Sequence, residues 1–127
     1  MSLKSPLGRV LGLGAAGGSH HWWLQRLSSL ALVPLSAWFA IALLTLPDLG
    51  WVTVHAWLAT PVTTVLLLLL VPTLVHHSWL GVAVVVEDYL PNPTSKTLTL
   101  LALQALHVLV AAAALFAILK IALGYTP

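Results

Sequence analysis

The sequence contains no cysteine, and charged residues occupy only 6% of its 127 positions. Without thiolates the chain can form no disulfide, hold no iron–sulfur cluster and bind no metal through sulfur. Its five Lys and Arg residues are scattered, so they form no basic patch of the kind that binds nucleic acid. Soluble domains carry about a quarter charged residues. This scarcity indicates that the chain belongs in a membrane.

Apolar residues are abundant instead, at 60% of the chain. Three segments are long enough to cross a hydrocarbon core of about 30 Å, which takes about 20 residues: residues 27–46, 61–86 and 97–119. We expect Pro34 to kink the first. The start of the chain lacks the apolar core of a secretory signal, so we expect it to be retained. The sequence predicts one all-α membrane domain, residues 1–127, with three transmembrane helices.

Two connections separate these spans. The stretch "PDLGWVTVHAWLAT" carries Trp51 and Trp57, which suit a membrane interface. It is read either as an interfacial connection or as an early start of the second helix. The stretch "LPNPTSK" carries two prolines and separates the second helix from the third.

The basic residues predict an orientation. Lys4, Arg9, Arg26 and Lys96 fall on one side of a three-span topology, and Lys120 falls on the other. Because Lys and Arg concentrate in cytoplasmic loops, we expect the N-terminus and the loop before the third span on the cytoplasmic side, or the matrix side in an organelle. The C-terminus is then outside. Three helices of this size enclose little, so we expect partner subunits.

His77 is an ionisable residue deep in the second span. It lies eleven residues before Asp88, at the helix end, which places it roughly 16 Å deep, near the bilayer midplane. Such a residue is a candidate for function. A neutral imidazole in a dry pocket suits axial ligation of a haem iron. The structural alternative is a histidine hydrogen-bonded across a helix interface.

Helical geometry favours His77 over its neighbour His76 as the ligand. His77 and Asp88 lie within about 20° on a helical wheel, whereas His76 points about 100° aside. Gly81, one turn beyond His77, leaves room for a flat macrocycle. We expect His76 to have a packing or hydrogen-bonding role. His107 lies at similar depth in the third span, so the second axial ligand could come from this chain or from a partner.

The cytoplasmic end of the second span predicts a quinone site. Tyr89 can donate a hydrogen bond to a quinone carbonyl, and Asp88 can relay the protons that quinone reduction consumes. The alternatives are an interface anchor for Tyr89 and solvated acids for the carboxylates. Arg26 begins the first span on the same side, as a flank or as a partner for haem propionates or quinone. His20 lies at the headgroup level nearby.

These residues resemble a known family. The stretch "HSWLGVAVVVEDYL", residues 77–90, resembles the second-helix signature of the hydrophobic membrane anchor subunit of succinate dehydrogenase, respiratory complex II: H-x-x-x-G, six residues, then D-Y. Residues 6–35 resemble the N-terminal part of the bacterial anchor, with a His before an aromatic pair and an Arg at the helix start. The resemblance covers essentially the whole chain.

The resemblance implies an assembly and a role. Two small anchor subunits would hold a flavoprotein and an iron–sulfur subunit on the membrane, and electrons from succinate would reach ubiquinone between them. Haem b would lie between the anchors, with one axial His from each. By resemblance the axial ligand and metal-binding residue is His77, Asp88 and Tyr89 belong to the quinone site, and Arg26 and His20 lie near propionates or quinone.

The same resemblance defines the expected setting. Membrane lipid surrounds the chain in a bacterial inner membrane or the mitochondrial inner membrane, no nucleic acid binds, and no complete active site lies on this chain. Two alternatives stay open: a quinol:fumarate reductase anchor, and a haem-free structural anchor. A small transporter is disfavoured, because the carboxylates lie at a helix end and transport usually needs more helices.

Overall fold

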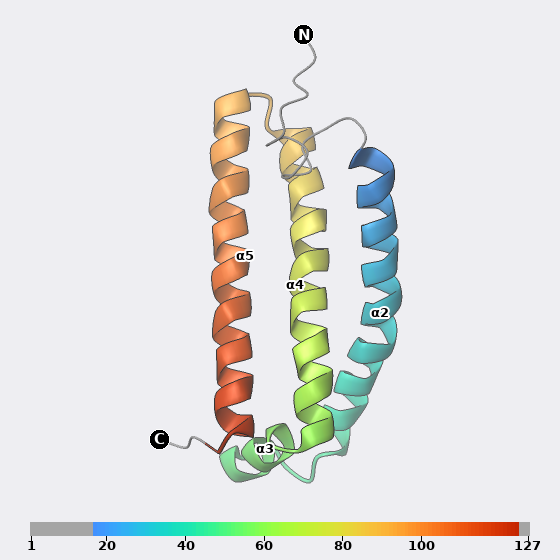
Figure 1. The fold of residues 1–127 in the computed structure, drawn as a ribbon, viewed down its shortest axis with the longest axis vertical. Coiled ribbons are helices and arrows are strands. Elements are labelled where there is room, and N and C mark those ends of the chain that lie inside the picture. Colours follow the sequence, from blue (N-terminus) through green and yellow to red (C-terminus); the bar gives the residue numbers. More distant parts are fainter. Residues whose placement is uncertain (1–16, 125–127) are drawn as a thin grey trace.

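The computed structural model describes residues 17–124, with side chains described from Trp22 onward. Four helices follow one another: α2 (Gly17–Thr45), α3 (Trp51–Leu58), α4 (Pro61–Tyr89) and α5 (Pro93–Ala122). The three long helices form one layer with α4 in the middle (Figure 1). Within the described residues α2 and α5 each pack on α4 and not on each other. Short α3 closes one end of the layer, which we call the α3 end. The opposite end, where α4 passes to α5, is the α4–α5 end.

Prolines and one asparagine set the helix boundaries at the α4–α5 end. Leu90 follows α4 with an extended backbone (φ −99°, ψ 106°), the conformation that a residue before proline prefers. Asn92 then caps α5: its side-chain oxygen accepts hydrogen bonds from the backbone N–H groups of Thr94 (2.9 Å) and Ser95 (3.3 Å). This cap satisfies donors that the first turn of a helix leaves free.

All three long helices have the length and composition to cross a membrane, which confirms the predicted number of spans. Each long helix is longer than its predicted span at one end or both. Helix α2 starts before residue 27, α4 continues past residue 86, and α5 extends beyond residues 97–119 at both ends. Backbone hydrogen bonding continues where the hydrophobic pattern stops, because polar residues at a membrane surface can still be helical.

Helix α3 is a separate element and not the start of the second span. Thr60 has an extended backbone (φ −69°, ψ 137°) because Pro61 follows it, and this breaks the helical path. Trp57 of α3 stacks on Trp38 of α2, with ring centroids 6.2 Å apart. The Thr64 hydroxyl donates to the carbonyl of Leu58 at 3.0 Å. These contacts tie α3 to both neighbouring long helices.

The prolines inside the spans do not interrupt them. Helix α2 continues through Pro34, just past its midpoint, and its ribbon bends in the second half (Figure 1). This agrees with the expected kink. Helix α4 likewise contains Pro72.

The interior of the layer is small. Among the described residues, five hydrophobic side chains are buried, and three of them, Leu67, Leu70 and Ile118, form one cluster between α4 and α5. Large apolar side chains cover the exposed surfaces of all three long helices. An apolar surface of this extent is typical of a chain that lipid or other subunits cover.

Candidate functional site

Two consecutive residues of α4 connect this helix to its two neighbours. The Nδ1 atom of His77 lies 3.1 Å from Oγ of Ser28 on α2. The Oγ atom of Ser78 lies 3.1 Å from Nε2 of His107 on α5. All four residues lie well inside their helices. Each pair joins a serine and a histidine, so α4 is hydrogen-bonded to both neighbours at nearly the same depth.

The two contacts of Ser28, taken together, assign one tautomer to His77. The Ser28 hydroxyl donates its single hydrogen to the carbonyl of Gln25, at 2.9 Å. Ser28 Oγ can therefore only accept from the imidazole. When both contacts of Ser28 form at once, His77 carries its proton on Nδ1, and in the neutral ring Nε2 keeps a free lone pair. No second hydrogen bond to His77 occurs among the residues with described side chains. Its Nε2 is thus the available ligand atom.

His107 shows the opposite arrangement, because the chain uses both of its ring nitrogens. Its Nδ1 donates to the carbonyl of Leu103 at 2.7 Å. A neutral ring then has its lone pair on Nε2, which accepts the hydroxyl hydrogen of Ser78. The ring also contacts Trp79 edge-on, with centroids 5.9 Å apart. His107 has no nitrogen free for iron, so nothing in its surroundings favours both axial ligands coming from this chain.

The surroundings of His77 are open toward the outside of this chain. Gly81, one turn on, is exposed, and a Cβ atom added to it would meet no atom within 4 Å. Packing within the described residues therefore does not require a glycine here. His76 is exposed as well, and no hydrogen bond reaches it from the described side chains, so its expected packing or hydrogen-bonding partner is not found within this part of the chain.

Asp88 and Tyr89 lie at the α4–α5 end, whereas Arg26 lies deeper, two residues before the Ser28 that contacts His77. Asp88 is exposed and Tyr89 is 80% exposed at the last turn of α4. Arg26 is exposed on α2, with its guanidinium 4.8 Å from the ring centroid of Trp22. Among the described residues no hydrogen bond or ion pair joins Arg26 to Asp88 or Tyr89. The backbone of His20 is helical, but its side chain lies outside the described part.

Metal ligands are sparse in this chain. Among the described residues no three His, Cys, Asp or Glu side chains come close enough to hold a metal ion. A metal at His77 would therefore take its other ligands from another molecule. The described residues therefore form no metal site of three or more side chains. His77 could still bind a metal whose other ligands belong to a cofactor.

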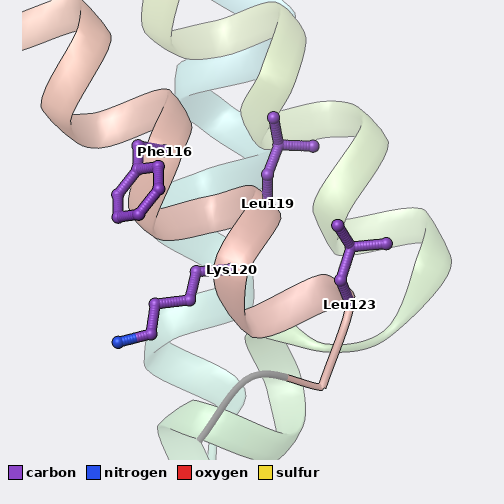
Figure 2. A pocket seen from close by; sticks show the side chains of 4 residues that line it. All are labelled: Phe116, Leu119, Lys120 and Leu123. Carbon is purple, nitrogen blue, oxygen red and sulfur yellow. The ribbon is translucent and has the colours of Figure 1, made fainter. Parts of the chain in front are cut away.

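A hollow of about 410 Å³ lies at the other end of the protein, near the C-terminal end of α5. Figure 2 shows the four side chains that line it: Phe116, Leu119, Lys120 and Leu123. Among its described lining residues, Lys120 is the one titratable group.

Sequence reasoning did not find Ser28 or Ser78. Both are small polar residues within apolar spans, and only the rotation of each helix about its axis shows that they reach a histidine. The polar pattern of α2, with Ser28 and Ser29 adjacent, was the available signal. It did not indicate which helix these hydroxyls face.

The chain is similar to one protein family. Residues 1–118 match the family described as the succinate dehydrogenase/fumarate reductase transmembrane subunit. A succinate dehydrogenase hydrophobic membrane anchor subunit of Rickettsia bellii is 32% identical over 105 residues, which cover 82% of this chain and 83% of that protein. The subunit of the same name from Rickettsia conorii is 38% identical over 77 residues, 60% of this chain and 61% of that protein. No solved structure matches.

The Ser78–His107 contact predicts a measurable coupling between α4 and α5. In a double-mutant cycle of Ser78→Ala and His107→Ala, we expect a coupling energy of about 0.6 kcal/mol, the average for hydrogen bonds between membrane helices. The free energy of unfolding of each variant is measured by SDS titration in mixed micelles, followed by tryptophan fluorescence. Strictly additive effects of the two substitutions would show that the bond does not hold the helices together.

Proposed function

The chain belongs to the succinate dehydrogenase/fumarate reductase transmembrane subunit family, and from this premise we propose that it binds haem b with a partner subunit and helps to form the ubiquinone site. As a membrane anchor of succinate dehydrogenase it is a multi-pass protein of a bacterial inner membrane. It is one subunit of an oxidoreductase complex. The proposal concerns which electron-transfer roles its own residues serve.

The free Nε2 lone pair of His77 carries the haem proposal. A histidine that ligates a metal typically donates its other ring N–H to a neighbouring oxygen, and His77 has this arrangement through Ser28. His107 lacks it, because both of its nitrogens are engaged. Of the two histidines within spans that contact a neighbouring helix, only His77 presents a ligand atom.

The residues around His77 fit a flat apolar macrocycle. Gly81 offers backbone without a side chain on the exposed surface one turn away. The described residues contain no competing set of metal ligands, whereas a haem brings four nitrogens and needs only axial groups. When bound, the haem supplies a one-electron carrier. The second histidine that holds the haem would come from the second small anchor subunit, packed against the exposed surface around Gly81.

The α4–α5 end is suited to quinone chemistry. The exposed hydroxyl of Tyr89 can donate a hydrogen bond to a quinone carbonyl, and the Asp88 carboxylate beside it can pass protons from water. Arg26 would supply positive charge between this end and the level of His77, for haem propionates or the quinone, and His20, earlier in α2, is a further candidate. Since all are exposed or at the helix end, the iron–sulfur subunit is the partner that would complete the site.

We place the α4–α5 end on the cytoplasmic side, facing the flavoprotein and iron–sulfur subunits. Lys96 lies at this end, Arg26 lies in the half of α2 nearer to it, and Lys120 lies at the other end, in keeping with the excess of basic residues on the cytoplasmic side. The family description also names fumarate reductase, so a quinol:fumarate reductase anchor is the second candidate. The similar proteins named for succinate dehydrogenase favour succinate oxidation.

Purification in mild detergent tests the whole proposal. We expect the tagged chain to bring down a flavoprotein, an iron–sulfur protein and a second small membrane subunit, with a reduced low-spin b-type spectrum. In His77→Ala this spectrum should disappear while the subunits still assemble. His76→Ala is the matched control and should keep the spectrum. If His76→Ala loses it and His77→Ala does not, the ligand assignment is wrong, and a haem-free wild-type complex would leave a structural anchor.

Tyr89→Phe tests the quinone role separately. Loss of one hydrogen bond, worth about 1 kcal/mol, should lower succinate:ubiquinone reductase activity about five- to tenfold, with the haem spectrum unchanged. Reduction of a water-soluble dye at the peripheral subunits should not change. Glu87→Gln, at a neighbouring exposed acid, is expected to keep full quinone activity. Equal activity of Tyr89→Phe and wild type would reduce Tyr89 to an interface anchor.

Thiol labelling tests the orientation. Because the chain has no cysteine, each single-cysteine variant carries one thiol. In intact spheroplasts a membrane-impermeant maleimide should label Leu49→Cys, in the connection near the α3 end. It should label Pro91→Cys, at the α4–α5 end, only after the membrane is opened and the peripheral subunits are stripped. The reverse pattern would invert the topology.

A further inference from the structure

We propose that Ser28 is a positioning residue that sets the tautomer of His77 and the electron-donating strength of its Nε2 atom. The inference rests on the proposed role of His77 as a haem ligand. Ser28 belongs to α2 and would not touch iron or haem itself; it acts through the imidazole. Its contribution would be to hold one ring orientation and to tune the reduction potential.

The geometry around Ser28 leaves it one role toward His77. Its side chain is buried, at 8% exposure, and its hydroxyl hydrogen is directed to the carbonyl of Gln25 at 2.9 Å. The oxygen is then a pure acceptor toward Nδ1 of His77 at 3.1 Å. Donation to the carbonyl also polarises the hydroxyl, which strengthens it as an acceptor.

This contact determines which nitrogen of His77 carries the proton. If the proton moved to Nε2, two lone pairs would oppose each other at Ser28, and the atom proposed to bind iron would carry hydrogen instead. Ser28 therefore favours the ligating tautomer before any haem binds. A hydrogen bond from Nδ1–H also raises the basicity of the ligand. A more basic ligand stabilises ferric over ferrous iron, so this contact would lower the haem potential.

The neighbouring pair shows that a serine near a histidine does not by itself produce this effect. Ser78 donates to Nε2 of His107, since Nδ1 of that ring already donates to Leu103. Ser78 follows His77 directly in α4 and forms a contact of the same 3.1 Å length. Ser78 occupies the Nε2 lone pair of His107, whereas Ser28 leaves the Nε2 lone pair of His77 free. Ser78 is consequently the matched control for Ser28.

The test is a redox titration of the haem b absorbance in the purified complex, with low-temperature electron paramagnetic resonance of the oxidised form. We expect Ser28→Ala to shift the midpoint potential upward and to change the principal g-values of the low-spin signal. Ser28→Thr keeps the hydroxyl and should titrate close to wild type. Ser78→Ala should leave both the potential and the g-values unchanged.

The outcomes separate this inference from the proposed function. If wild type holds a haem that His77→Ala removes, but Ser28→Ala titrates as wild type, the positioning role is overturned and the ligand stands. A shift of equal size in Ser78→Ala also overturns it, because general loosening of α4 would then be the cause. If Ser28→Ala loses haem altogether, recovery in Ser28→Thr supports the role and failure to recover contradicts it. A complex without haem would overturn both proposals.

Discussion

The rest of the structure depends on how polar groups inside the layer find hydrogen-bond partners without water. In a bilayer core an unpaired polar group costs several kcal/mol. Among the described residues no buried side-chain nitrogen or oxygen lacks a partner. Serine hydroxyls achieve this by donating to carbonyls of their own helix, as Ser28 and Ser29 do to Gln25. The Ser28 oxygen can then still accept a hydrogen bond, and its partner is Nδ1 of His77 on α4.

The central helix α4 provides hydrogen-bond partners for polar groups on both of its neighbours. Helices α2 and α5 both pack on α4, which bonds to them through the consecutive residues His77 and Ser78. Successive residues on a helix point about 100° apart, so one short segment reaches both neighbours. The hydrophobic cluster, including Leu67 and Ile118, holds the α3 end, and the serine–histidine pairs act nearer the middle of the membrane.

The sequence was sufficient for the spans and insufficient for the contacts between them. Hydropathy identified the three long helices, because a membrane selects length and composition. It did not show that Thr60, extended before Pro61, would separate α3 from the second span. Wheel angles placed Gly81 and His77 on one face of α4, but the partner of His77 depends on how α2 is rotated. Ser28 could therefore be found only once the helices were placed together.

An open layer of three helices is also compatible with the proposed ligand role of His77. A closed bundle would surround His77 with its own side chains, whereas in this layer His77 is only half-buried. Here His77 contacts Ser28 on one side, and the surface at Gly81, one turn away, is exposed. A glycine that no neighbour within this chain requires makes sense when the close approach comes from outside it. The proposed second subunit and cofactor would complete the layer at this exposed surface.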